Sequence, residues 1–270
     1  MIAQVGNPFV ALSNWFVALS NWRRVVWLAM CQIFVALGRQ NRLGFVMALL
    51  EPLFAVAMVY TFRGLLKGNT PNYGSSLFLF YVSGFLPYYL FLRLSSRTRN
   101  SGVGAGRRLP GLSALDAYIA TTLVGAIIWV GMTVLTFLAM WWISDIKEIS
   151  NIAISVCAVP LLLLILLAMG VGMLNNAISR YIPFWGLIYA VLTRGGVIVS
   201  GVLHVVDLQA LKIRQYSIIN PLSHAIEWFR LGIWERYPHN SLDKGYLIEW
   251  VIITLFLGMV IDRASMRTAD

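Results

Sequence analysis

Three stretches of the sequence contain no Asp, Glu, Lys or Arg: residues 68–92, 117–144 and 149–179. Each is longer than the roughly 20 residues that an α-helix needs to cross the hydrocarbon core of a bilayer. Hydrophobic residues make up 59% of the 270-residue chain and charged residues only 12%, a composition that excludes a soluble globular domain. The sequence therefore predicts an all-α membrane protein.

The hydrophobic pattern predicts six transmembrane helices. We expect the last to be the weakest, because only 12 residues separate Glu249 from Asp262. The predicted spans lie at about 43–62, 73–92, 117–143, 150–176, 181–203 and 246–262.

An even number of spans places both termini on one side of the membrane, and the basic residues indicate which side. Cytoplasmic segments of membrane proteins carry an excess of Lys and Arg. The side that holds both termini receives twelve basic residues: Arg23, Arg24, Arg39, Arg42, Arg93, Arg97, Arg99, Arg107, Arg108, Arg180, Arg263 and Arg267. The other side receives eight: Arg63, Lys67, Lys147, Lys212, Arg214, Arg230, Arg236 and Lys244. We therefore expect a multi-pass protein of the bacterial inner membrane with both termini in the cytoplasm.

Residues 1–42 are expected to form a lead-in followed by an interface helix. The heptad FVALSNW begins at Phe9 and again at Phe16, and we interpret this repeat as a poorly constrained segment without a specific role. Trp22 to Gly38 is predicted to lie as an amphipathic helix in the cytoplasmic interface, because its apolar run is too short to span comfortably. An additional spanning helix is the alternative.

Two of the predicted connections are long. Residues 93–116 contain five arginines, and the GVGAG sequence within them has the composition of a flexible connector. Residues 204–245 are amphipathic, and we expect two short helices there on the outer face. Asn220 followed by Pro221 is a helix-start signal, and a helix is predicted from there to Trp234.

Motifs for catalysis and metal binding are missing from the sequence. It has no Walker A loop, HExxH motif, nucleophile elbow, Gly-rich dinucleotide fingerprint or Asp-x-Asp pair. Cys31 and Cys157 have no Cys or His nearby at metal-ligand spacing, so both are interpreted as packing residues. We expect no cofactor or metal on this chain, and a membrane enzyme of lipid-linked sugar metabolism is the least favoured function.

Two ionisable residues, Glu51 and Arg194, lie in the middle of predicted spans. A charged group at that depth normally faces protein or a water-filled cavity. Either each residue satisfies a neighbouring helix in a packed bundle, or the two line a polar translocation route.

Aromatic residues are dense in the second and fifth predicted spans. They fit either interface anchors and packing or a lining that stacks on sugar rings. At about 100° per residue, Trp185 and Tyr189 share one face of a helix, whereas Arg194 points to the opposite side. Unless Gly195 and Gly196 bend this helix, only one of the two sets can line a single pathway.

Four segments together resemble the ABC-2 type permeases. Over roughly residues 22–265 the chain is similar to the permeases of capsular polysaccharide exporters, which makes residues 43–265 the six-helix transmembrane domain and 266–270 a cytoplasmic tail. Glu51-Pro52, and the Asn-Pro pair with downstream Glu and Arg, are the specific parts. The segments are LGFVMALLEPL at 43–53, SGFLPYYLF at 83–91, LPGLSALDAYIA at 109–120 and NPLSHAIEWFR at 220–230.

The resemblance implies a homodimer paired with two copies of a separate ATP-binding subunit. That subunit would hold ATP and Mg²⁺, so this chain would have no ATPase site of its own. The family's cytoplasmic coupling helix, between spans 2 and 3, maps onto about Ser95 to Leu112; the alternative is that its arginines only enforce topology. The expected ATPase-coupling residues are Arg97, Arg99, Arg107, Arg108 and Pro110.

The resemblance also implies periplasmic gate helices between spans 5 and 6, which map onto about Leu203 to Trp234. The expected gate residues are Tyr216, Asn220, Pro221, His224, Glu227, Trp228, Arg230 and Trp234. The candidate residues for the translocation path are Glu51, Tyr60, Tyr88, Tyr89, Trp185, Tyr189 and Arg194.

By this resemblance the chain exports a lipid-linked polysaccharide, together with periplasmic and outer-membrane components. The net charge of +10 favours an acidic polymer. Membrane lipids are the other expected partners, and nucleic acid is not one. The permease of an O-antigen or teichoic-acid exporter would look nearly the same, and a drug or lipid ABC-2 exporter is a further alternative.

Overall fold

Helices account for all regular secondary structure in the part of the chain that the structure describes. The computed structural model describes residues 8–39, 42–67, 71–101, 112–143 and 146–267. The all-α prediction is confirmed for these residues. The elements are α1 (Pro8–Arg39), α2 (Arg42–Lys67), α3 (Leu77–Ser101), α5 (Ala114–Ile143), α6 (Lys147–Ser150), α7 (Ile154–Tyr181), α8 (Trp185–Val199), the 3₁₀ helix η1 (Val206–Leu208), α9 (Leu211–Ile219), α10 (Pro221–Leu231) and α11 (Lys244–Arg267).

Among the described residues, four helices are long and apolar enough to cross a membrane: α3, α5, α7 and α11. The predicted first and fifth spans fall on α2 and α8, of which α8 has only 15 residues. The prediction that the last span is the weakest is wrong, because α11 runs for 24 residues. Asp262 does not interrupt it, since this carboxylate is buried and paired with Arg180 of α7 at 2.8 Å.

Three predicted boundaries are also wrong. Helix α3 continues past residue 92 to Ser101, so the first arginines of the predicted connection are helical. Helix α1 begins at Pro8 and includes the repeated heptad, whose two copies contain no Gly or Pro that would interrupt a helix. Helix α10 ends at Leu231 rather than at Trp234, and Gly232 follows it as the C-cap.

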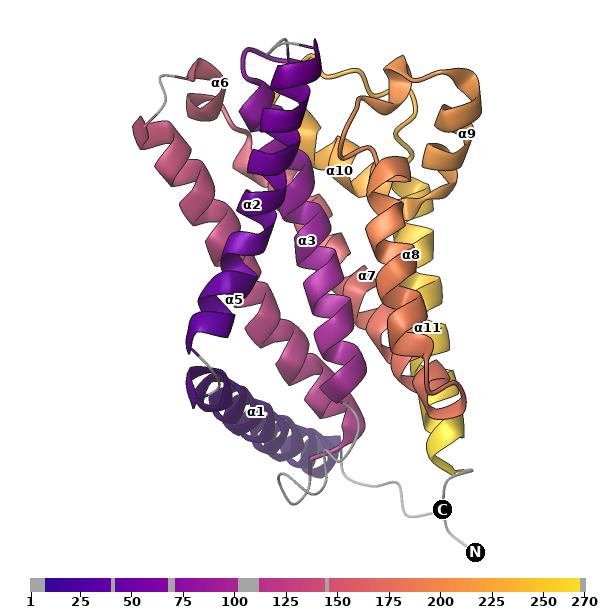
Figure 1. Cartoon of the computed structure of the whole chain (residues 1–270). Helices are drawn as coiled ribbons and strands as arrows, with labels where there is room; N and C mark the ends of the chain where they lie inside the picture. The colour runs from indigo at the N-terminus through magenta and orange to yellow at the C-terminus, as the bar shows by residue number, and fades with distance from the viewer. Residues whose placement is uncertain (1–7, 40–41, 68–70, 102–111, 144–145, 268–270) are drawn as a thin grey trace, which may run out of the picture.

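Apart from α1, the long helices lie side by side in one bundle, and the short elements gather at one end of it (Figure 1). Helix α3 packs against α2, α5, α7 and α10. Helix α1 crosses the opposite end obliquely, whereas α6, α9 and α10 lie at the other end. The roles of α1 as an interface helix and of α9 and α10 as outer helices stay predictions.

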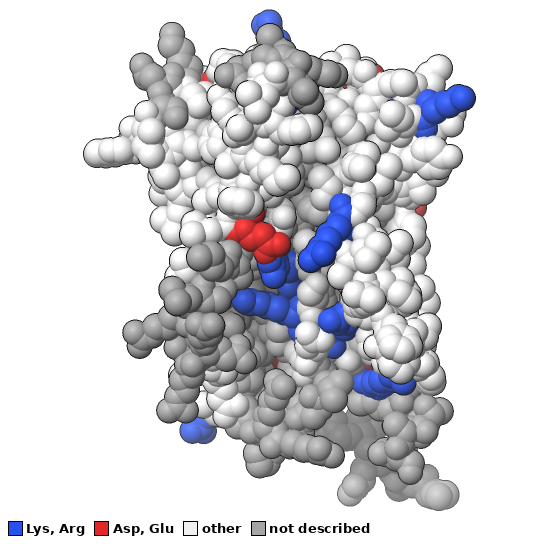
Figure 2. Space-filling model, viewed as in Figure 1, with Lys and Arg blue, Asp and Glu red and all other residues white. Residues whose placement is uncertain are grey.

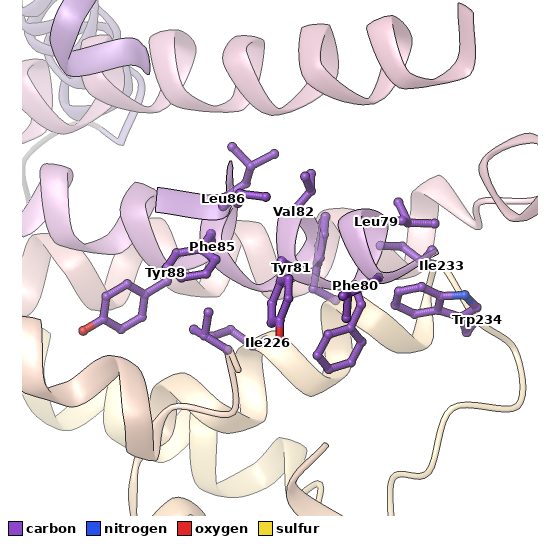
Figure 3. Packing of buried hydrophobic residues seen from close by; sticks show 14 of the residues in the cluster. Leu79, Phe80, Tyr81, Val82, Phe85, Leu86, Tyr88, Ile226, Ile233 and Trp234 are labelled. Carbon is purple, nitrogen blue, oxygen red and sulfur yellow. The ribbon is translucent and has the colours of Figure 1, made fainter. Parts of the chain in front are cut away.

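The largest buried cluster joins α3 to α10 and to the segment that follows α10. Phe80, Tyr81 and Ile226 belong to this cluster, and Trp234 lies beside Phe80 (Figure 3). The rings of Phe80 and Trp234 are 6.3 Å apart. Helix α10 starts where the sequence predicts, because the Asn220 side chain accepts a bond from the Leu222 amide at 3.1 Å and Pro221 takes the first helical position.

Helix α1 is attached to the start of α5. The Trp22 indole donates to Asp116 at 2.8 Å. The other carboxylate oxygen of Asp116 accepts from the Ser113 amide at 3.0 Å, while the Asp116 amide donates to the Ser113 hydroxyl at 3.1 Å. This reciprocal cap begins α5 and, through Trp22, also holds α1.

Candidate functional site

An ion pair on the surface of the bundle joins α2 to α3. Arg93 of α3 pairs with Glu51 of α2, and the two side chains are 31% and 43% exposed. The pair therefore lies at an accessible face rather than inside the chain. Helix α2 has no backbone donor at Pro52, the residue after Glu51.

Two further arginines surround this pair. Arg97 lies one helical turn after Arg93, and both Arg97 and Arg194 of α8 interact electrostatically with Arg93. Basic side chains gather around an acidic one on this face, between α2 and α8 (Figure 2). Such charges are costly in hydrocarbon, so this face must contact protein or water rather than lipid. We call Glu51, Arg93, Arg97 and Arg194 the cationic face.

The predicted path residues divide into two groups. Glu51 and Arg194 belong to the cationic face, and the half-buried Tyr89 borders it, because Tyr89 interacts electrostatically with Arg194. Tyr60 packs edge-on against Phe78 with ring centroids 6.0 Å apart.

The remaining path candidates hold helices together. Tyr88 is buried and donates to the Thr193 carbonyl of α8. Trp185 donates to the Asn175 side chain of α7 at 2.8 Å, and the Tyr189 hydroxyl lies 2.8 Å from that of Ser95 in α3. Helix α8 is continuous past Arg194, which is exposed, whereas Tyr189 is buried. The expectation that these two residues point to different sides is confirmed.

Arg230 organises the predicted gate region from inside the protein. Its guanidinium is completely buried and lies 3.9 Å from the centroid of the Phe80 ring. Its acceptors come from α3 and from the segments on either side of α10: the carbonyls of Phe80, Gly201, Val202 and His204 and the hydroxyls of Ser83 and Tyr237, at 2.7 to 3.4 Å. Arg230 therefore ties the connection after α8 to α3.

His224 and Trp228 connect α10 to the start of α11. The His224 ring lies 2.8 Å from the Ile218 carbonyl through Nε2 and accepts at Nδ1 from the Asp243 amide at 3.1 Å. Burial lowers the pKa of His224, which favours the neutral ring. Lys244 lies 4.9 Å over the Trp228 ring. Of the other expected gate residues, Trp234 is buried beyond the end of α10, whereas Tyr216 on α9 is exposed.

Glu227 is a buried carboxyl beside this network. It is 1% exposed, and its Oε1 has no hydrogen-bond partner among the described residues. Burial, helped by the negative charge of Asp207, raises the pKa of Glu227 from 4.5 to about 8, against the opposing charge of Arg230. Glu227 is therefore mostly protonated at neutral pH.

The predicted ATPase-coupling residues fall in two places. Arg97 and Arg99 lie in the last turns of α3, and Arg99 donates to the Asn100 side chain at 3.2 Å. Arg107, Arg108 and Pro110 lie outside the described residues. The role of all five in ATPase coupling stays a prediction.

The described residues contain no group of three or more His, Cys, Asp or Glu side chains that could hold a metal ion. Asp207, in η1, already accepts from Arg214 at 3.0 Å and from the Asn240 amide at 2.6 Å. Its carboxylate thus serves the folding of the connection between α8 and α11.

Two kinds of curated protein are similar to the chain over most of its length. Two proteins named polysialic acid transport protein KpsM, from Escherichia coli, are each 26% identical over 229 residues, which cover 82% of this chain and 86% of theirs. The chain is a homologue of polysaccharide transport proteins. The capsule polysaccharide export inner-membrane protein CtrC of Neisseria meningitidis serogroup B is 22% identical over 255 residues, 92% of each chain. No protein-family profile matches the sequence.

The resemblance of this chain to capsular polysaccharide export permeases is thus confirmed. Sequence reasoning nevertheless missed Arg93, because the predicted second span ends at residue 92 and leaves Arg93 as a flanking charge. The spacing of Arg93 and Arg97, four residues apart on an extended helix, is the signal that could have found it. Ser83 and Tyr237, which support Arg230, have no comparable sequence signal.

The buried Glu227 makes the stability of this protein depend on pH. Because the pKa of Glu227 is higher in the folded chain than in the unfolded chain, the folded state holds more protons between about pH 5 and 8. The contribution of Glu227 to stability then falls as pH rises, by up to about 1.4 kcal/mol per unit. Burial, with the charge of Arg230, lowers the pKa of His204 from 6.5 to about 4, so this histidine contributes the opposite slope below about pH 6.5. Glu227→Gln should therefore remove a fall in thermal stability that is clearest from about pH 6.5 to 8. Glu249→Gln, at an exposed position on α11, should keep the wild-type slope.

Proposed function

We propose that this chain is the permease subunit of an ABC transporter that exports a lipid-linked acidic capsular polysaccharide across the bacterial inner membrane. ATP would be hydrolysed on a separate subunit that binds Mg²⁺. The homologues KpsM and CtrC support the polysaccharide class, since their names refer to polysialic acid transport and capsule polysaccharide export. The cationic face is the observation that supports an acidic substrate.

This face holds three guanidinium groups and one carboxylate at the level of the apolar helices. Within the described ranges, neither Arg97 nor Arg194 has an ion pair or a side-chain hydrogen bond, and both could contact a polymer. A surplus of positive charge lowers the free energy of a carboxylate or phosphate that passes through a weakly polar region. A neutral polymer would gain nothing from this arrangement.

A homodimer would cover this face. The exposed Arg194 shares α8 with exposed apolar side chains, including Leu187 at 71% and Val191 at 63%. Lipid suits the apolar side chains but not the guanidinium. Two copies that meet along α2 and α8 would enclose both cationic faces in one polar path and leave the remaining helices to lipid.

The two ends of the bundle would contact the ATP-binding subunits and the export apparatus. The end crossed by α1 would face the cytoplasm, with both termini, and would receive the ATP-binding subunits through the segment after α3. The opposite end, with α9 and α10, would face the periplasm and close the path until the export apparatus engages. Closure of the ATPase pair would push on the coupling segment and reorient the spans.

Deletion of this chain in its bacterium tests the proposal. Acidic polymer should accumulate in the cytoplasm and disappear from the cell surface, and inactivation of the ATP-binding partner should give the same result. Re-expression of the chain should restore surface polymer. Loss of O-antigen or teichoic acid with intact capsule would instead indicate the related exporters, and unchanged surface glycans with altered uptake of hydrophobic compounds into inverted vesicles would indicate a drug or lipid exporter.

A further inference from the structure

The ion pair on the cationic face contains an acidic side chain that the transport of an acidic polymer does not require. Glu51 repels a passing carboxylate and is paired with Arg93, the arginine that interacts electrostatically with both Arg97 and Arg194. A path built only to attract anions would omit it. A carboxylate is also costly in an apolar helix such as α2.

We propose that Glu51 is a resident counter-anion, which holds Arg93 when the path is empty and is displaced by an anionic group of the polymer during export. This inference rests on the proposed function and assigns a specific step to one ion pair. Each anionic group of the polymer would bind Arg93 as Glu51 leaves, and Glu51 would return as the group moves on.

The exposure of the pair permits such an exchange. With 43% of the Glu51 side chain and 31% of the Arg93 side chain accessible, a third charged group can reach the pair without unfolding the helices. A partly exposed ion pair is weak enough to open readily. Asp262 and Arg180 form a contrasting pair, because the Asp262 side chain is only 5% exposed and is closed to an incoming anion.

Arg93 retains unused capacity to bind a second anion. Its contact with Glu51 uses Nη2, whereas its Nε is buried and has no hydrogen-bond partner among the described residues, so an arriving anion would bind through the Nη groups. A guanidinium presents five N–H donors. During exchange the arriving carboxylate can therefore contact Arg93 before Glu51 has left, so the guanidinium is never without a counter-charge.

The exchange would set how long the polymer stays bound. A conducting path must bind its substrate well enough to admit it and weakly enough to release it. With Glu51 absent, three unopposed arginines would hold an anionic group more tightly and export it more slowly. Tighter binding with slower export is the distinguishing result, because loss of a purely structural contact would weaken both.

The test uses the chain assembled with its ATP-binding partner in lipid nanodiscs, with fluorescent oligosialic acid as the acidic probe and labelled dextran of equal length as the neutral one. Glu51→Gln should bind oligosialic acid about threefold to tenfold more tightly than wild type, without a change for dextran. The same variant should export polymer more slowly in cells. Glu249→Gln, which removes a carboxylate from an exposed site on α11, should match wild type in both assays.

Equal binding of oligosialic acid by Glu51→Gln and wild type would overturn the exchange and leave the proposed export function standing. If wild type binds oligosialic acid no better than dextran, the proposal of an acidic substrate is wrong, and the proposed exchange at Glu51 is wrong with it. Should Glu51→Gln not fold, the double variant Glu51→Gln with Arg93→Gln decides. Exchange predicts that the double variant binds oligosialic acid more weakly than wild type, whereas wild-type affinity would show a merely structural pair.

Discussion

Replacement of Arg230 by methionine should lower the unfolding free energy by on the order of 3–5 kcal/mol. Methionine occupies a similar space but donates no hydrogen bond, so the carbonyls of Gly201 and Val202, which accept at 2.7 and 2.8 Å, would be left buried without this donor. The melting temperature of the purified chain in detergent should fall by on the order of 10 °C.

Arg236→Met is the matched control for this prediction. Arg236 follows closely in sequence but is exposed, so the same substitution should change the melting temperature little. Arg230→Lys should give an intermediate loss, because an ammonium group keeps the charge but cannot reach acceptors on both sides of the buried site. Equal melting temperatures for Arg230→Met and Arg236→Met would show that the buried network contributes no net stability.

The crossing of α7 and α11 gives the second large effect, because Gly170→Leu should prevent these helices from packing. A Cβ at Gly170 would lie 2.7 Å from the backbone of Thr254 and Leu255, and one at Gly258 would lie 2.9 Å from the Gly170 carbonyl. Backbone atoms cannot move aside as a flexible side chain can, so the cost should exceed about 3 kcal/mol. We expect loss of the monodisperse peak in size-exclusion chromatography.

Gly131→Leu is the control for Gly170→Leu. A Cβ at Gly131, in the middle of α5, has no neighbour within 4 Å, so leucine there should be tolerated and should favour the helix. If both glycine variants elute as wild type, α7 and α11 do not approach each other as closely as the structure indicates. If both fail, the effect comes from leucine in a spanning helix rather than from the crossing.

The features that sequence reasoning predicted correctly depend on local chemistry. Helix α10 begins at Pro221 because Asn220 caps it, and both residues are adjacent in the chain. The opposite directions of Tyr189 and Arg194 follow from the helical period alone once α8 is continuous. Helix ends were less predictable. Helix α3 extends past Arg93 and Arg97, because Arg93 pairs with Glu51 and both arginines lie on the cationic face instead of against lipid.

The site residues were predictable only in part, for a related reason. The sequence identifies Glu51 and Arg194 as unusual because charges interrupt apolar segments. It does not reveal that Arg93 lies between them, since that depends on α2, α3 and α8 being neighbours. It likewise assigns Arg230 to an external amphipathic helix, whereas the folded chain buries this side chain completely.

The sequence by itself determined that the chain is helical and lipid-embedded, because long runs without charge have no other stable environment. It also determined that α10 starts at Pro221. Tertiary structure decided which segments meet. It pairs Glu51 with Arg93, brings the carbonyls that accept from Arg230 together, and lets α7 and α11 approach closely at Gly170. The physical reason is range, since capping and hydrophobic periodicity act within a few residues, whereas these contacts join segments that only the packed bundle brings together.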